Sequence, residues 1–484
     1  MDASLPTPSV PPDPLEGKRA NWHSYEASAA AGALEVPNKP VQLFLEITSR
    51  CNLRCGKCGF AWDPELAKNG KDIAWPLLAR MEDFFEAATE VYTFGYGEMF
   101  LYPELAPLIT VLKNHHCRVS GVTNGTMIRP ADVVWLVATG YDHLAFSIDG
   151  ATEETMDKLR GASHKKVLNV LRLIHEEKER RQAKHPNIVV NFVAQADNYH
   201  ELPELVRQLA PLGIYFLGVN PLHHFGDAPG GYGRYYEAYR LNRVDRTEWE
   251  TLVREAQALA EGAGMLFENF VNPDFEWRAE TAVTGAVPLH VHAAPPAAAE
   301  ETPAMPPAAE ARAVASEPDP APEPPLVSLP VLGSTPSLPV PTATALPSMY
   351  CHYPWTTLYL SAAGTAKVCC HMAVGEGLGS FTGEGGIGAV WNGPQLQSVR
   401  EHIREGRVHP ACAQCVAHRS FENHVASMNP IRAELFPPAP PALARPLVEP
   451  EPEPEPESTG LQRILRRLRV GRSRDGGDST GAAT

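Results

Sequence analysis

The most informative stretch of the chain reads VQLFLEITSRCNLRCGKC over residues 41–58. Its first half is an apolar run that is typical of a buried strand. Its second half places three cysteines, Cys51, Cys55 and Cys58, in a short loop directly after this strand. The stretch therefore predicts a strand that delivers three thiols to one edge of a sheet.

Three thiols at this spacing fit an iron-sulfur cluster better than other uses of cysteine. A [4Fe-4S] cube normally takes four thiolates, so three protein ligands leave one iron open to bind another molecule. A structural zinc site wants four protein ligands. A disulfide is disfavoured because the chain has 9 Cys, an odd number, and opens without a secretory signal. A zinc knuckle, a disulfide and three unrelated thiols are the alternatives.

The cysteine loop resembles the C-x3-C-x2-C signature of the radical S-adenosylmethionine (radical SAM) enzymes. The resemblance implies that the open iron chelates the amino and carboxylate groups of S-adenosylmethionine. It also implies that an electron from the reduced cluster cleaves the sulfonium and gives a 5′-deoxyadenosyl radical, which abstracts hydrogen from a substrate. One departure from the family pattern is Lys57, where many members carry an aromatic residue.

The chain has 484 residues, of which 44% are hydrophobic and 20% are charged. This length and composition suit about two or three folded domains. Proline marks the boundaries because it lacks an amide donor and has a fixed φ. We expect a Pro-rich N-terminal extension that is loosely organised (1–40), a first folded block (41–285), a disordered Pro-rich linker (286–347), a second folded block (348–436) and a disordered tail (437–484).

The charge and the apolar pattern limit the expected partners. A formal net charge of −15 argues against a nucleic-acid-binding surface, so small molecules or proteins are the expected partners. No apolar run is long enough to span a membrane, and we expect a cytoplasmic location, where thiols stay reduced. The segment 461–469 in the tail predicts a short basic amphipathic helix for an anionic membrane surface or an acidic partner, with a solvated tail as the alternative.

The first block alternates strand-like and helix-like patterns, which is the signature of a parallel α/β fold. Helices are expected at 103–116, 164–181 and 201–212. Six strand-helix repeats match the partial (β/α)6 TIM-like barrel that the radical SAM resemblance implies. In such barrels the loops after the strands build the site. The strands are expected near 42–48, 90–95, 117–122, 143–148, 188–194 and 214–219.

A glycine-rich turn follows the second predicted strand. Gly95-Tyr96-Gly97-Glu98 resembles the Gly-Gly-Glu motif of the family. The resemblance implies that the bare glycine backbone approaches the methionine amino group of S-adenosylmethionine and that Glu98 accepts a hydrogen bond from it.

Polar residues also follow the fourth predicted strand. Ser147 and Asp149 lie on the same face of the strand end, and Arg160 comes shortly afterwards. The resemblance implies that these three contact the ribose or the carboxylate of S-adenosylmethionine. A helix cap for Asp149 and a surface ion pair for Arg160 are the structural alternatives.

The second block resembles the SPASM and twitch domains that accompany radical SAM barrels. Twelve residues separate Cys351 from Gly364, and four separate Gly364 from Cys369, as in the C-x(9-15)-G-x4-C element of those domains. A full SPASM domain has another cysteine where this chain has Phe421. The twitch pattern then leaves four ligands for one auxiliary [4Fe-4S] cluster, Cys351, Cys369, Cys412 and Cys415.

A fully ligated auxiliary cluster has no vacancy for substrate, so its expected role is electron transfer. Cys370 competes with Cys369 as the ligand. The alternative is zinc, held by Cys412 and Cys415 together with Cys369, Cys370, His352 or His371.

The leading prediction is a radical SAM oxidoreductase that acts on a small carbohydrate or cyclitol-like substrate, by analogy with twitch-type enzymes. The auxiliary cluster would accept an electron, and a flavodoxin- or ferredoxin-type protein would donate one. The alternative is a maturase that modifies a ribosomally made peptide. A non-catalytic iron-sulfur scaffold is a third class. The sequence identifies no catalytic acid or base.

Overall fold

The computed structural model describes residues 13–62, 69–222, 232–272, 277, 351–369, 377–383, 385–412, 432 and 435–436. All of them belong to the unit Met1–Phe436. The predicted linker 286–347 and the tail 437–484, with its predicted basic helix, lie outside the described residues.

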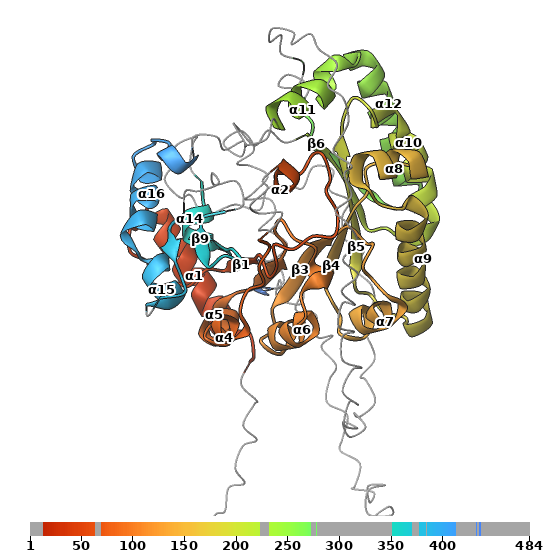
Figure 1. Ribbon diagram of the computed structural model, residues 1–484. Helices are drawn as coiled ribbons and strands as arrows, with labels where there is room; N and C mark the ends of the chain where they lie inside the picture. The colour runs from red at the N-terminus through yellow and green to blue at the C-terminus, as the bar shows by residue number, and fades with distance from the viewer. Residues whose placement is uncertain are drawn as a thin grey trace, which may run out of the picture. The chain divides into compact units, whose positions relative to one another are not determined.

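One sheet organises the described residues (Figure 1). Its strand order is β10-β9-β8-β1-β2-β3-β4-β5-β6-β7. Neighbours from β8 to β7 pair in parallel, and β9 and β10 join antiparallel. The strands are β1 (Gln42–Leu45), β2 (Glu90–Thr93), β3 (Arg118–Thr123), β4 (His143–Ser147), β5 (Asn187–Ala194), β6 (Phe216–Pro221), β7 (Leu266–Asn269), β8 (Thr357–Leu360), β9 (Thr365–Lys367) and β10 (Gly379–Ser380).

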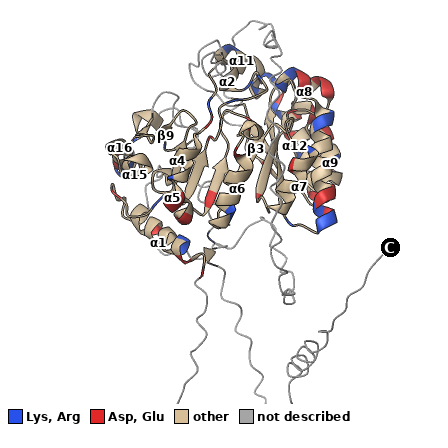
Figure 2. Ribbon diagram, turned by 60° about the horizontal axis from the view of Figure 1, so that its bottom comes forward, with Lys and Arg blue, Asp and Glu red and all other residues tan. Residues whose placement is uncertain are grey.

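Helices connect the strands, and α8 and α9 are rich in charged residues, which Figure 2 marks in blue and red along their ribbons. None of the described helices is long and apolar enough to cross a membrane. The helices are α1 (Glu16–Ala30), α2 (Gly59–Trp62), α4 (Trp75–Ala79), α5 (Glu82–Ala87), α6 (Leu105–Asn114), α7 (Pro130–Ala138), α8 (Glu153–Arg160), α9 (His164–Arg181), α10 (Leu202–Leu209), α11 (Tyr232–Tyr239), α12 (Arg246–Gly262), α14 (Tyr353–Thr356), α15 (Gly386–Trp391) and α16 (Pro394–Arg404).

The predicted α/β fold class is confirmed. The six predicted strands correspond to β1 through β6, with ends shifted by a few residues, and the three predicted helices correspond to α6, α9 and α10. The sequence did not predict that the sheet continues at both ends. There, β7 extends it beyond β6, and β8 of the second block pairs in parallel with β1, in the register Gln42 to Thr357. Both blocks therefore contribute strands to one sheet.

The chain before the first strand contains α1, which the sequence did not predict. Prolines crowd positions 6–14, but residues 15–36 are free of proline, and Glu16–Ala30 within them fold into a helix with buried side chains. The ammonium of Lys18 is buried and donates to the Phe85 carbonyl oxygen at 2.9 Å. The expectation of a loosely organised extension therefore does not hold for residues 13–40.

The segment after α1 binds the second block through buried donors. The indole of Trp355 donates to the Ala33 carbonyl oxygen (2.8 Å), and that of Trp391 donates to the Asn38 carbonyl oxygen (2.6 Å). The guanidinium of Arg400 donates to the Leu34 carbonyl oxygen at 2.7 Å. Because buried polar groups require partners, these bonds fix the N-terminal segment between the two blocks.

Candidate functional site

The three-cysteine loop leaves the carboxyl end of β1 in the structure as the sequence predicts. Cys55 is buried, whereas Cys51 and Cys58 are half-buried, and none of the three forms a disulfide. The backbone amide of Leu53 points at the Cys51 sulfur at 3.5 Å, and the amide of Cys58 donates to the Cys55 carbonyl oxygen at 3.0 Å. The loop therefore turns back on itself and keeps the three sulfurs in one neighbourhood.

The electrostatics of this loop call for a cationic group. Burial raises the pKa of the Cys51 thiol to about 12, and the neighbouring Cys55, Glu98 and Cys58 add to the increase. Three thiolates cannot coexist here without positive charge, which the irons of a cluster supply. Within the described ranges, no three His, Cys, Asp or Glu side chains converge closely enough to hold a single metal ion. The buried thiols of this loop therefore fit the cationic irons of a cluster on the grounds of charge.

The glycine turn packs against the chain that leads into the cysteine loop. A methyl group added at Gly95 would overlap the side chain of Glu46, and one added at Gly97 would overlap the carbonyl oxygen of Thr48. The sequence assigned these glycines to the approach of a ligand. In the structure their immediate neighbours are β1 and the residues that follow it, so close packing within the chain is a second reason for glycine here.

Glu98 links the glycine turn to the end of β3 and, through Asn124, to the cysteine loop. Its buried carboxylate accepts hydrogen bonds from the Thr123 hydroxyl (2.7 Å), the Asn124 amide (2.7 Å) and the Phe100 amide (3.3 Å). The side chain of Asn124 in turn donates to Asn52 of the cysteine loop at 3.0 Å. Burial raises the pKa of Glu98, while these hydrogen bonds oppose the increase. Glu98 thus braces the ends of β2 and β3, and its predicted contact with S-adenosylmethionine stays a prediction.

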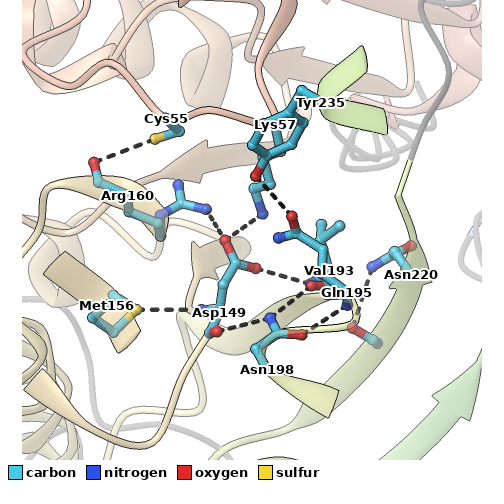
Figure 3. A network of polar contacts seen from close by, with 11 residues as sticks. Cys55, Lys57, Asp149, Met156, Arg160, Val193, Gln195, Asn198, Asn220 and Tyr235 are labelled. Atoms are coloured by element: carbon cyan, nitrogen blue, oxygen red, sulfur yellow. Dashed lines mark hydrogen bonds and ion pairs between the residues drawn. The ribbon is translucent and has the colours of Figure 1, made fainter. Parts of the chain in front are cut away.

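Asp149 and Arg160 form a buried ion pair at the end of β4 (Figure 3). Asp149 Oδ2 lies 2.6 Å from Arg160 Nη1, and Oδ1 accepts a hydrogen bond from the Val193 amide at 2.8 Å. Arg160 is the last residue of α8, which ends because Gly161 adopts a left-handed conformation with φ 68°. The end of α8 therefore places Arg160 beside Asp149. Because the pair is buried, Asp149 is not a helix cap and Arg160 is not part of a surface ion pair.

Lys57 joins this pair from the cysteine loop, and sequence reasoning did not assign it a role. Its ammonium contacts the same Oδ2 of Asp149 that Arg160 contacts. Burial opposes ionisation of Asp149, but the charges of Lys57 and Arg160 outweigh it and hold the pKa of the carboxyl below its ordinary value. The only signal in the sequence was the departure from an aromatic residue at position 57.

The remaining predicted residues are distributed over both blocks. Ser147 ends β4 and is half-buried. Cys351 precedes α14, Cys369 follows β9, and Cys412 ends a short 3-10 helix that begins at Pro410. The fourth predicted auxiliary ligand, Cys415, lies outside the described residues, as do the competing Cys370 and His371.

Two family models match this chain. One is described as the radical SAM superfamily and matches residues 45–209. The other is described as an iron-sulfur cluster-binding domain, SPASM, and matches residues 351–416. The first range holds the cysteine loop and the ends of β2 to β4, and the second holds the four predicted auxiliary cysteines.

Three relatives illustrate the sequence similarity. A tungsten-containing aldehyde ferredoxin oxidoreductase cofactor-modifying protein of Pyrococcus furiosus is 32% identical over 36% of this chain and 49% of that protein. A PqqA peptide cyclase of Gluconobacter oxydans is 26% identical over 50% of this chain and 64% of its own. A mycofactocin maturase of Mycobacterium tuberculosis is 33% identical over 25% of this chain and 31% of that protein. The chain thus matches less than two thirds of each relative's length.

Among solved structures, Streptococcus suis SuiB bound to S-adenosylmethionine aligns with a TM-score of 0.49 and 14% identity, over 81% of this chain and 74% of that one. The matched domains imply a SAM-binding [4Fe-4S] cluster, auxiliary iron-sulfur clusters and S-adenosylmethionine as cofactors. Residues 45–209 therefore form a radical SAM domain, and residues 351–416 form a SPASM domain in the C-terminal part of the chain.

Proposed function

We propose that this chain is a radical SAM enzyme that modifies a peptide. The observation that carries the proposal is the position of Cys51, Cys55 and Cys58 at the carboxyl end of β1, the strand that also pairs with β8 of the SPASM region. This pairing gives the two cysteine-bearing regions a common scaffold. Barrel folds of this kind build their sites at that edge of the sheet.

When bound, the cluster and S-adenosylmethionine supply a 5′-deoxyadenosyl radical that removes a hydrogen atom from the substrate. The chain's own task is to hold and enclose this chemistry. The three thiols anchor the cluster, and Glu98 keeps the neighbouring turns fixed through Thr123 and Asn124. The site-residue assignments made from the sequence, Gly95, Gly97, Ser147, Asp149 and Arg160 included, belong to this proposal.

A peptide substrate is preferred over the carbohydrate or cyclitol-like substrate of the leading prediction. Of the three relatives compared above, the PqqA peptide cyclase matches the largest share of this chain, 50%. Its name gives a peptide as what it acts on. None of the three names a carbohydrate or a cyclitol.

The SPASM region completes the proposal. We assign Cys351, Cys369, Cys412 and Cys415 to an auxiliary [4Fe-4S] cluster that accepts an electron, so that the reaction is oxidoreductase-like. The division into a barrel block (41–285) and an auxiliary block (348–436), a flavodoxin- or ferredoxin-type donor and a cytoplasmic location are parts of the same proposal.

The test uses the full chain, reconstituted anaerobically with iron and sulfide and reduced with dithionite. S-adenosylmethionine is added with synthetic peptides encoded by short reading frames beside the gene. We expect one peptide to increase 5′-deoxyadenosine production and to change in mass. Stimulation by carbohydrates or cyclitols, with no response to any peptide, would support the small-molecule reading instead. Absence of 5′-deoxyadenosine under all conditions would leave only the scaffold class.

A further inference from the structure

A buried group at the end of β4 holds two positive side chains, Lys57 and Arg160, and one negative side chain, Asp149. The side chains of Lys57 and Arg160 are 12% and 8% exposed, and that of Asp149 is fully buried. Both cations contact the same carboxylate oxygen, Oδ2 (Figure 3). Two positive groups therefore share one negative group. A purely structural salt bridge would need only one cation, because an uncompensated buried charge is unfavourable.

The surroundings of this group contribute donors and one further carboxylate, Glu98, whose pKa burial raises while the charge of Arg160 lowers it. Asp149 Oδ1 is already bound by the Val193 amide. Two buried donors, Arg160 Nε and Gln195 Nε2, have no hydrogen-bond acceptor within the part of the chain that the structure describes. The surroundings therefore leave two buried donors for a group that the described residues do not supply.

The cysteine loop is the neighbour that carries compensating negative charge. The Cys55 thiol lies 3.6 Å from the carbonyl oxygen of Arg160, and Lys57 lies between Cys55 and Cys58 in the loop itself. A cube of the [4Fe-4S]2+ type with three thiolates has a net charge of about −1, and about −2 after it accepts one electron. A fixed positive charge therefore stabilises the reduced form more than the oxidised form.

A hydrogen-bonded frame holds Lys57 in this position. The ring of Tyr235 in α11 lies against Gly56, where an added methyl carbon would be 2.7 Å from Cε2. The Tyr235 hydroxyl donates to Gln195 Oε1 at 2.7 Å, and the side chain of Asn198 donates to the Asp149 carbonyl oxygen at 2.8 Å. The loop, β4, β5 and α11 therefore meet around one carboxylate, and the ammonium has little freedom to turn toward water.

We propose that Lys57 is a positioning residue whose ammonium, standing where many relatives have an aromatic side chain, supplies the unpaired positive charge of the Asp149 group and raises the reduction potential of the cluster on Cys51, Cys55 and Cys58. Arg160 and Asp149 neutralise one another, so Lys57 contributes the surplus. The inference rests on the proposed function, because it requires a redox-active cluster in this loop.

The experiment is an anaerobic redox titration of the reconstituted full chain, followed by electron paramagnetic resonance without substrate. The signal that changes when S-adenosylmethionine is added identifies the cluster of the cysteine loop. We compare the wild type with Lys57→Met, Lys57→Arg and Lys158→Met. Lys158 is a matched control because it lies on α8 with Arg160 and pairs with Asp197 at 2.7 Å, but its side chain is 45% exposed.

We expect Lys57→Met to shift the midpoint potential to a more negative value, and Lys57→Arg and Lys158→Met to stay near the wild type. Lys57→Arg changes the shape of the side chain but keeps its charge. A wild-type midpoint potential in Lys57→Arg would therefore assign the shift in Lys57→Met to the lost charge and not to lost packing. If Lys57→Met does not assemble the cluster, Lys57→Gln, which keeps a donor for Asp149, takes its place with the same expected shift. An unchanged midpoint in a charge-removing variant with normal iron content would overturn the inference.

Failure of the radical SAM part of the proposed function gives a different result. In that case the wild type itself shows no signal that responds to S-adenosylmethionine, whatever residue stands at position 57. A responsive wild-type signal together with an unshifted Lys57→Met midpoint removes only the role of Lys57.

Discussion

The hydroxyl of Tyr359 in β8 lies 2.7 Å from carboxylate oxygen Oε2 of Glu46 in β1. Glu46 also accepts hydrogen bonds from the Tyr96 amide in the glycine turn (3.2 Å) and from the Ala362 amide after β8 (3.2 Å). Burial raises the pKa of this carboxyl, and the Tyr359, Tyr96 and Ala362 hydrogen bonds oppose the increase. One side chain thus connects the barrel, the glycine turn and the SPASM region.

Replacing Glu46 by Ala should destabilise the protein by about 2–4 kcal/mol, because it leaves one buried amide, one half-buried amide and one buried hydroxyl without an acceptor. Glu46→Gln keeps the shape of the side chain and one acceptor oxygen, so this variant should lose less stability. Urea unfolding monitored by circular dichroism measures both changes. Glu248→Ala is the matched control, since Glu248 also accepts from a tyrosine, Tyr199, but on the surface. Equal effects of Glu46→Ala and Glu248→Ala would disprove the bridging role.

Replacing Gly97 by Ala should prevent correct assembly of the cysteine loop. The added methyl group would overlap the Thr48 and Arg50 carbonyl oxygens, which belong to backbone and cannot rotate away. We expect a large loss of iron bound after reconstitution, measured by colorimetric assay. Gly262→Ala serves as control because nothing lies within 4 Å of the added carbon, and it should bind iron as the wild type does. Normal iron content in Gly97→Ala would show that the turn can accommodate a methyl group, which would contradict this prediction.

His143 gives the folded state a pH dependence. Burial, and then the charge of Arg118 at 2.6 Å, lower the pKa of His143 to about 4. The unfolded chain takes up this proton near pH 6.5, so the contribution of His143 to stability is complete above that pH. It is lost as the pH falls toward 4, by up to about 3 kcal/mol.

Urea unfolding at pH 7 and pH 4.5 tests this dependence. His143→Gln should lose less stability between the two values than the wild type, whereas His200→Gln, on an exposed side chain, should lose as much as the wild type. If His143→Gln loses as much unfolding free energy between pH 7 and pH 4.5 as the wild type does, other groups cause the acid sensitivity.

The sequence predicted the features that depend on short stretches of the chain. The six core strands and the helix His164–Arg181 follow from patterns within short windows, and the cysteine loop follows from its spacing. Pairing of β8 with β1 joins residues such as Gln42 and Thr357, which are far apart in the chain, and nothing in either segment specifies its partner. The same holds for Lys57 and Asp149, since a contact between two loops depends on the completed sheet. Helix α1 was missed because proline-rich neighbours dominated the composition of its segment.

Iron content and 5′-deoxyadenosine production in Cys55→Ala and Cys412→Ala test the account most directly. The wild type should bind about eight irons per chain, as two cubes require. Cys55→Ala should bind about half and produce no 5′-deoxyadenosine, whereas Cys412→Ala should retain at least part of the cleavage because the loop that activates S-adenosylmethionine is intact. Zinc in place of iron at Cys51, Cys55 and Cys58, or undiminished cleavage by Cys55→Ala, would contradict it.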